Sequence, residues 1–146
     1  MLVLQDDALL CEDFAARAVE AVAARPEALL ALFTPGFPFM ARRVEQQRRR
    51  GEAFADLPPA AFVPVVAMAY PRAHVEGLLA YSDGSRWPKA TRMGTADDAI
   101  VAGYVRANRL SVVATVPSLV EHDDEVPSLA KPSHRQGKHR RAAWFA

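Results

Sequence analysis

The residues best suited to chemistry follow directly after an apolar run at Met1–Leu4, where Gln5, Asp6 and Asp7 stand together. Adjacent carboxylates repel each other, so each must stay solvated or be paired. If the run is a strand of an open α/β sheet, its carboxyl end faces the crevice in which ligands bind. Carboxylate oxygens there suit Mg²⁺ or Mn²⁺. The competing interpretation is a solvated turn before a helix.

The elements that must position these residues alternate between strands and helices. The uninterrupted apolar run at 1–4 predicts a strand buried on both faces, inside a sheet. Because nothing precedes that strand, the chain reads like a domain that has lost its front part or borrows it from elsewhere. The other predicted elements are helices over 11–25, 41–50, 71–81 and 95–108, strands over 28–33, 62–70 and 111–116, and loops over 82–95 and 117–127. This order predicts an α/β fold, a mixed sheet flanked by helices.

Composition excludes several classes of protein. The chain has 146 residues, of which 51% are hydrophobic and 24% charged, as expected for one globular domain. A net charge of +1 argues against a general attraction to nucleic acid. The single cysteine, Cys11, excludes an internal disulfide. The sequence contains no apolar run of about 18 residues and no signal peptide, so we expect no membrane span and a cytoplasmic location.

The run from Val3 to Ala8, with Gln5, Asp6 and Asp7 at its centre, resembles the metal-binding motif of nucleotide-diphospho-sugar glycosyltransferases with the GT-A fold. Many of these enzymes carry a strand followed by Glu-Asp-Asp or Asp-x-Asp, so Gln5 stands where an acidic residue is commoner. The resemblance implies that Asp7 binds the metal directly. It also implies that Asp6 and Gln5 contact the metal shell or the nucleoside.

A second segment, 115–129, resembles the Pro-Ser-Leu-Val-x-His sequence, followed by Ser-Leu, near the end of several such domains. The resemblance implies that His122 completes the shell of Mn²⁺ or Mg²⁺, because a neutral imidazole can join carboxylates around a divalent ion. The competing interpretation is a loop histidine that bonds neighbouring backbone. Ser128 in this segment and Arg135 in the basic tail are the further candidates for contacts to the nucleotide.

The third segment, 94–104, resembles the late helix that opens with an acid in these enzymes. The resemblance implies that Asp98 or Asp97, with Asp98 preferred, contacts the acceptor hydroxyl and takes its proton in inverting members. Acids in a first helical turn also stabilise a helix by about 0.3–1 kcal/mol each, and the two roles are compatible. The strand that ends in Tyr-Pro-Arg at 70–72 resembles the acceptor side of the family.

The sequence therefore predicts a metal-dependent glycosyltransferase-like domain over 1–130, which would lack the N-terminal nucleotide-binding units of a GT-A fold, and a basic tail over 131–146. The tail could close over the site as a lid. The predicted partners are a nucleotide-sugar donor and an acceptor, with a second copy or another chain pairing through the N-terminal strand. The alternatives are a non-catalytic remnant, a fragment that needs a partner chain, or a small module that binds phosphate or nucleic acid through the tail.

Overall fold

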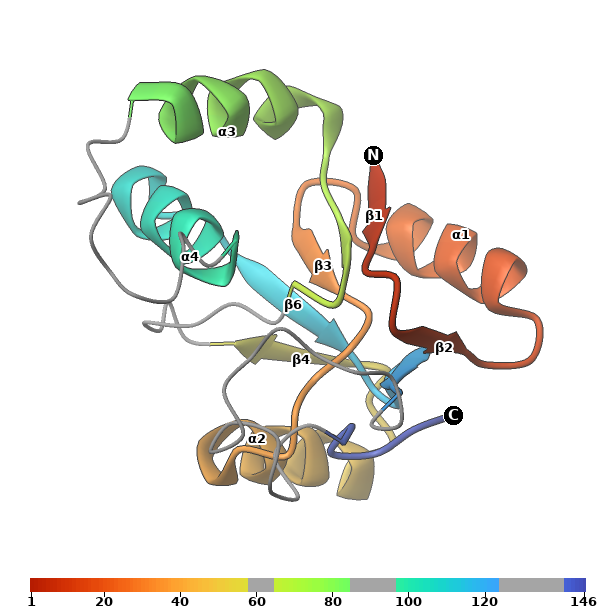
Figure 1. Ribbon diagram of the computed structural model, residues 1–146. Helices are drawn as coiled ribbons and strands as arrows, with labels where there is room; N and C mark the ends of the chain where they lie inside the picture. The colour runs from red at the N-terminus through yellow and green to blue at the C-terminus, as the bar shows by residue number, and fades with distance from the viewer. Residues whose placement is uncertain (58–64, 85–96, 124–140) are drawn as a thin grey trace.

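A mixed five-stranded sheet forms the centre of the protein in the computed structural model, which describes residues 1–57, 65–84, 97–123 and 141–146 (Figure 1). Its strands lie in the order β1 (Leu2–Leu4), β5 (Ala67–Ala69), β3 (Leu29–Ala31), β6 (Val112–Thr115) and β4 (Phe54–Leu57). β3 and β6 pair in parallel, and every other pair in this sheet is antiparallel. β1, β3 and β6 therefore run in one direction. The predicted α/β class with a mixed sheet is confirmed.

A separate two-stranded sheet pairs β2 (Ala8–Leu10) with β7 (Val120–His122), near the point where β6 ends (Figure 1). The sequence pattern predicted neither β2 nor β4. The prediction of a loop over 117–127 is wrong for β7, whose residues are all buried. Strands of three or four residues are too short to show the period-two pattern of a strand. Polar Glu121 and His122 also gave β7 the composition of a loop.

Four described helices flank the sheet: α1 (Phe14–Ala24), α2 (Pro38–Arg49), α3 (Arg72–Gly84) and α4 (Asp97–Asn108). α1 ends at Ala24 with Arg25 as its C-cap, so the helix stops before Pro26, as predicted. α2 has proline as its first residue, and Gly51 follows it with a φ of 70°, a conformation that glycine adopts without strain. α3 continues to Gly84, so the predicted loop over 82–95 is wrong for its first residues; the rest of that loop lies outside the described residues.

The core divides into two hydrophobic clusters, one on each face of the sheet, because side chains alternate along each strand. On one face Leu30 and Ala69 pack with Phe14 and Ala18 of α1. On the other, the cluster joins the sheet to α2 and α4, with α3 packed against it through partly buried residues; its members include Leu29, Ala31, Val44, Met68, Val101 and Val105. The result is a three-layer arrangement with the sheet in the middle.

The packing of α3 on α4 depends on one glycine. A Cβ at Gly77 would lie 2.6 Å from the Tyr104 hydroxyl, so glycine allows the close approach of the two helices. The rings of Tyr81 and His74 meet the Tyr104 ring nearly edge-on, with centroids 5.8 and 6.4 Å away. No described helix is long and apolar enough to cross a membrane.

β1 is a strand, as predicted, but the expectation that it is buried on both faces is wrong. Among the described residues the sheet ends at β1, which pairs only with β5. Leu2, Val3 and Leu4 are 45%, 39% and 38% exposed. An uninterrupted apolar run is usually the mark of a central strand, and here it occupies an edge.

Candidate functional site

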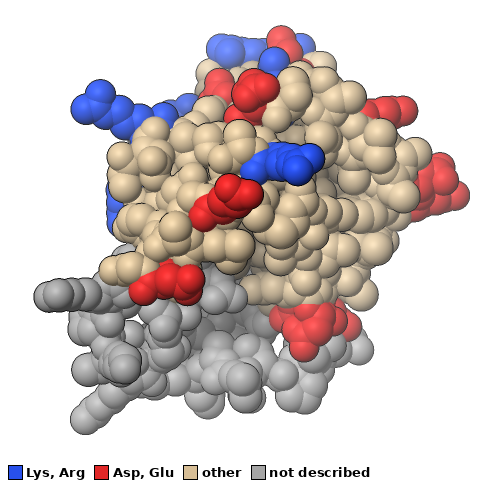
Figure 2. Space-filling view, turned by 90° about the horizontal axis from the view of Figure 1, so that it is seen from above, with Lys and Arg blue, Asp and Glu red and all other residues tan. Residues whose placement is uncertain are grey.

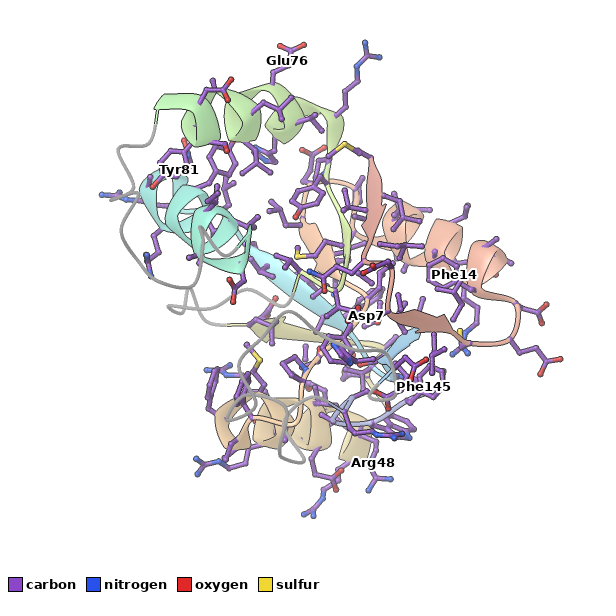
Figure 3. The ribbon with its side chains drawn as sticks, in the orientation of Figure 1. Asp7, Phe14, Arg48, Glu76, Tyr81 and Phe145 are labelled. Carbon is purple, nitrogen blue, oxygen red and sulfur yellow. The ribbon has the colours of Figure 1, made fainter. Side chains whose placement is uncertain are left out.

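The carboxyl ends of β1, β3 and β6 meet at one edge of the sheet, because these strands run in one direction. Asp7 lies in the turn between β1 and β2, and Figure 3 shows it at the junction of the two strands. His122 is the last residue of β7, which pairs with β2. This edge therefore brings together two of the residues that the sequence singled out.

The backbone of the small sheet places Asp7 next to His122. Ala8 lies opposite His122 in the register, and the N–H of Asp123 donates to the carbonyl oxygen of Asp7 over 2.8 Å. The side chains meet directly, with His122 Nε2 at 3.1 Å from Asp7 Oδ2. The His122 side chain is 9% exposed and that of Asp7 17%. A carboxylate in such contact orients the imidazole ring.

The donor set at this pair fits a divalent cation. Asp7 Oδ1 is buried and has no hydrogen-bond partner among the described residues, so one carboxylate oxygen is left for another ligand. Donors in neighbouring positions around a small divalent ion lie about 3 Å apart, since each sits at about 2.1 Å from it. The 3.1 Å between Nε2 and Oδ2 is compatible with that spacing and equally with a direct hydrogen bond. Within the described part of the chain there is no group of three or more candidate ligands, so the pair supplies two donors.

Glu121 organises this edge of the sheet, although the sequence pattern did not single it out. Its side chain is buried, and Oε1 accepts hydrogen bonds from the N–H groups of His122 at 2.8 Å and Ala142 at 2.7 Å. One carboxylate therefore holds both the candidate ligand His122 and the end of the chain. Its position inside a three-residue strand offers no local signal of this role.

The last six residues, 141–146, lie across the loops that follow β3 and β6. The carbonyl of Arg141 accepts from the N–H of Gly36, and the carbonyl of Thr34 accepts from the N–H of Ala143. Ser118 donates its N–H to the carbonyl of Trp144 over 2.8 Å. The end of the predicted tail is thus docked at the carboxyl edge of the sheet. The predicted lid also includes residues 131–140, which lie outside the described residues.

The other predicted site residues are not gathered around this pair by any described contact. The backbone N–H of Gln5 bonds the carbonyl of Val66, and Asp6 is exposed in the turn. Asp98 lies in the first turn of α4, where its Oδ1 accepts from the N–H of Ala99 at 2.9 Å. Asp97 begins α4, but its side chain lies outside the described part, as do Ser128 and Arg135.

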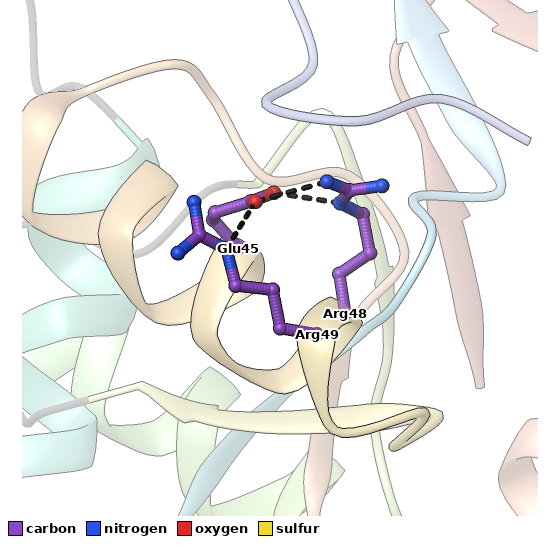
Figure 4. A network of polar contacts seen from close by, with 3 residues as sticks. All are labelled: Glu45, Arg48 and Arg49. Carbon is purple, nitrogen blue, oxygen red and sulfur yellow. Dashed lines mark hydrogen bonds and ion pairs between the residues drawn. The ribbon is translucent and has the colours of Figure 1, made fainter.

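The helix α2 is rich in arginine, and its arginines lie on its exposed face. Glu45 Oε2 and Oε1 accept from Arg48 Nε at 2.6 Å and Nη2 at 2.9 Å, and Oε1 also accepts from Arg49 Nε at 2.8 Å (Figure 4). The hydrogen bonds from Arg48 and then Arg49 lower the pKa of Glu45 from 4.5 to about 2. The Arg48 guanidinium also lies 5.5 Å from the centre of the Trp144 ring. Arg48 and Arg49 therefore make contacts within the protein itself.

Comparisons with known proteins give no assignment: no protein-family model, curated protein or solved structure matches the chain.

Proposed function

We propose that this chain carries the metal-binding half of a glycosyltransferase site of the GT-A type, which transfers a sugar from a nucleotide-diphospho-sugar to an acceptor hydroxyl. The observation that carries the proposal is the contact between Asp7 and His122, which are far apart in sequence and lie 3.1 Å apart at the carboxyl edge of the sheet. Both were candidates on sequence alone. Asp7 Oδ1, which is buried and has no partner within the described part of the chain, adds a reason to expect a cation there.

Asp7 and His122 would hold Mn²⁺ or Mg²⁺. The ion, when bound, would neutralise the diphosphate of the donor and so favour departure of the nucleotide. Glu121 keeps His122 in place through the backbone hydrogen bond to its N–H. The ring of Phe33 lies beside the imidazole, with ring centroids 6.3 Å apart. Gln5 and Asp6, in the same turn as Asp7, would contact the nucleoside or the metal shell.

Asp98, or Asp97 beside it, would orient the acceptor hydroxyl and take its proton during attack on the anomeric carbon. A hydroxyl is a poor nucleophile, so a carboxylate within hydrogen-bond reach lowers the barrier for the attack. The Asp98 carboxylate stands at the N-terminal end of α4, where its Oδ1 accepts from the N–H of Ala99. Positioning and charge stabilisation would then provide most of the catalysis.

Titration calorimetry tests the proposal. The wild-type chain is titrated with UDP-, GDP- and dTDP-sugars, with and without Mn²⁺. We expect nucleotide binding that requires Mn²⁺ and that weakens at least tenfold in Asp7→Asn. Asp13→Asn is the matched control, because Asp13 has a φ of 54°, which asparagine also adopts readily. Metal-independent binding, or equal weakening in both variants, would contradict the proposal.

A further inference from the structure

The outer edge of β1 has backbone groups that point away from the sheet. The N–H of Tyr70 donates to the carbonyl of Met1 at 2.7 Å, and the N–H of Gln5 donates to the carbonyl of Val66 at 2.9 Å. Hydrogen-bonded pairs alternate with non-bonded pairs along an antiparallel ladder, so Met1, Val3 and Gln5 face β5. The N–H and C=O groups of Leu2 and Leu4 therefore point outward, where no described strand lies.

This edge lacks the usual protection against pairing. Natural edge strands carry charges, proline or bulges that prevent another strand from joining. The side chains of residues 1–4 include no charge and no proline, Leu2–Leu4 pair with β5 in regular register, and residues 1–4 are 38–55% exposed. On the face of the molecule that Figure 2 shows from above, charged side chains stand singly or in small groups with uncharged surface between them. Nothing in the edge itself would repel an apolar strand.

An apolar groove lies beside the same edge. It has a volume of about 540 Å³ and runs between β1 and α1, with Leu2, Ala18, Val19 and Val22 among its lining residues. Val19 and Val22 are 69% and 43% exposed. Leu2 pairs with Ala69, which packs on the α1 side of the sheet. A strand added to β1 would thus place alternate side chains toward this groove.

We propose that a second copy of this chain occupies the edge, with the two β1 strands antiparallel and a two-fold axis through Val3. With the axis through Val3, Leu2 of one copy lies opposite Leu4 of the other. The outward N–H and C=O groups of each leucine then bond the C=O and N–H groups of the opposite leucine, so all of them are paired. β1 has no charged side chain, and in this register the ammonium of Met1 lies opposite Gln5 of the second copy, so self-pairing brings no like charges together. The proposal does not depend on the proposed function.

The paired surface is small. A standard stable interface buries about 800 Å² on each partner, from about 20–30 residues, whereas this one consists of a three-residue strand and the exposed valines of α1. We therefore expect a dimer that dissociates on dilution. Sedimentation equilibrium from low to high micromolar concentration should show a monomer–dimer transition. A monomer over the whole range would overturn the proposal.

Cysteine cross-linking tests the register. Val3 faces Val3 of the second copy at a non-hydrogen-bonded position, where cross-strand Cβ atoms come closest. Val3→Cys should therefore form a disulfide-linked dimer under mild oxidation. Leu2→Cys is the matched control, since its position faces Leu4 of the second copy. The native Cys11 is buried and present in both variants. Equal or greater cross-linking of Leu2→Cys would overturn the register through Val3.

A proline substitution tests the hydrogen bonds. Leu4→Pro removes an outward N–H and none of the bonds to β5, and proline is tolerated on an edge strand when its missing N–H faces solvent. We expect this variant to keep the wild-type circular dichroism and melting temperature within a few degrees, and to lose the dimer at concentrations where the wild type associates. A folded Leu4→Pro variant that dimerises like the wild type would contradict the pairing. If Leu4→Pro does not fold, Leu4→Lys, which exposes a charge on the same edge, replaces it with the same expected loss.

Discussion

The protein contains two clusters of polar side chains that differ in burial and in number of contacts. One joins Asp7 to His122, and the other joins Glu45 to Arg48 and Arg49. The first has one direct contact, at 3.1 Å, between side chains that are 9% and 17% exposed. The second has several short hydrogen bonds on an exposed helix face. Solvent already satisfies charges on a surface, so breaking such a cluster costs little. Breaking the buried pair removes a contact that water replaces poorly, so it costs more. We therefore expect burial, more than the number of contacts, to decide how much each cluster contributes to the free energy of unfolding.

The largest loss of stability should come from Glu121, the buried carboxylate that holds the backbone of His122. Glu121→Ala removes the acceptor for the N–H groups of His122 and Ala142, and we expect a loss of about 2–4 kcal/mol in the free energy of unfolding. Urea denaturation measures it. Glu121→Gln keeps a carbonyl oxygen at the same place and should lose clearly less. Wild-type stability in Glu121→Ala would show that its hydrogen bonds to His122 and Ala142 do not contribute to the free energy of unfolding.

The contact between Asp7 and His122 should give the next largest effect. Asp7→Ala and His122→Ala should each cost about 1–3 kcal/mol, because each removes a direct contact from a largely buried side chain. The double variant should cost less than the sum of the two, which a double-mutant cycle by urea denaturation detects. Strictly additive losses would mean that the two side chains do not interact, and the contrast with the surface cluster would fail.

The smallest effect should come from Glu45 on α2, and it should depend on pH. Its pKa falls from 4.5 to about 2 on folding, so its contribution to stability is present above pH 4.5 and is lost as the pH falls toward 2. Glu45→Gln should melt slightly below the wild type at pH 7, with a difference that disappears near pH 2. Thermal melts across this range check it. A difference that grows on acidification would have the wrong sign.

The sequence predicted the parts of the fold that depend on local pattern. The apolar segment around β3, the periodic face of α1 and the β-branched residues of β6 each identify their own element. β2, β4 and β7 escaped because such short strands are defined by their partners, which lie far away in the chain. The exposed position of β1 could not be predicted either, since apolar composition does not tell a central strand from an edge.

In the candidate site, too, local pattern identified residues but not the long-range contacts between them. Asp7 and His122 were singled out by resemblance, but their contact depends on the register of β2 with β7, which no local pattern carries. Glu121 had no signal at all, because its role lies in backbone hydrogen bonds to residues at the end of the chain. The side chains of Asp97, Ser128 and Arg135 lie outside the described residues, so their roles stay predictions.

The most direct test of the metal site is pulsed electron paramagnetic resonance of Mn²⁺ added to the protein together with UDP. If His122 binds the ion, the spectrum should show modulation from an imidazole nitrogen, and His122→Gln should abolish it. His74→Gln, on α3, should keep the modulation. An unchanged nitrogen signal in His122→Gln, or Mn²⁺ that stays fully hydrated in the wild type, would contradict a metal site built on Asp7 and His122.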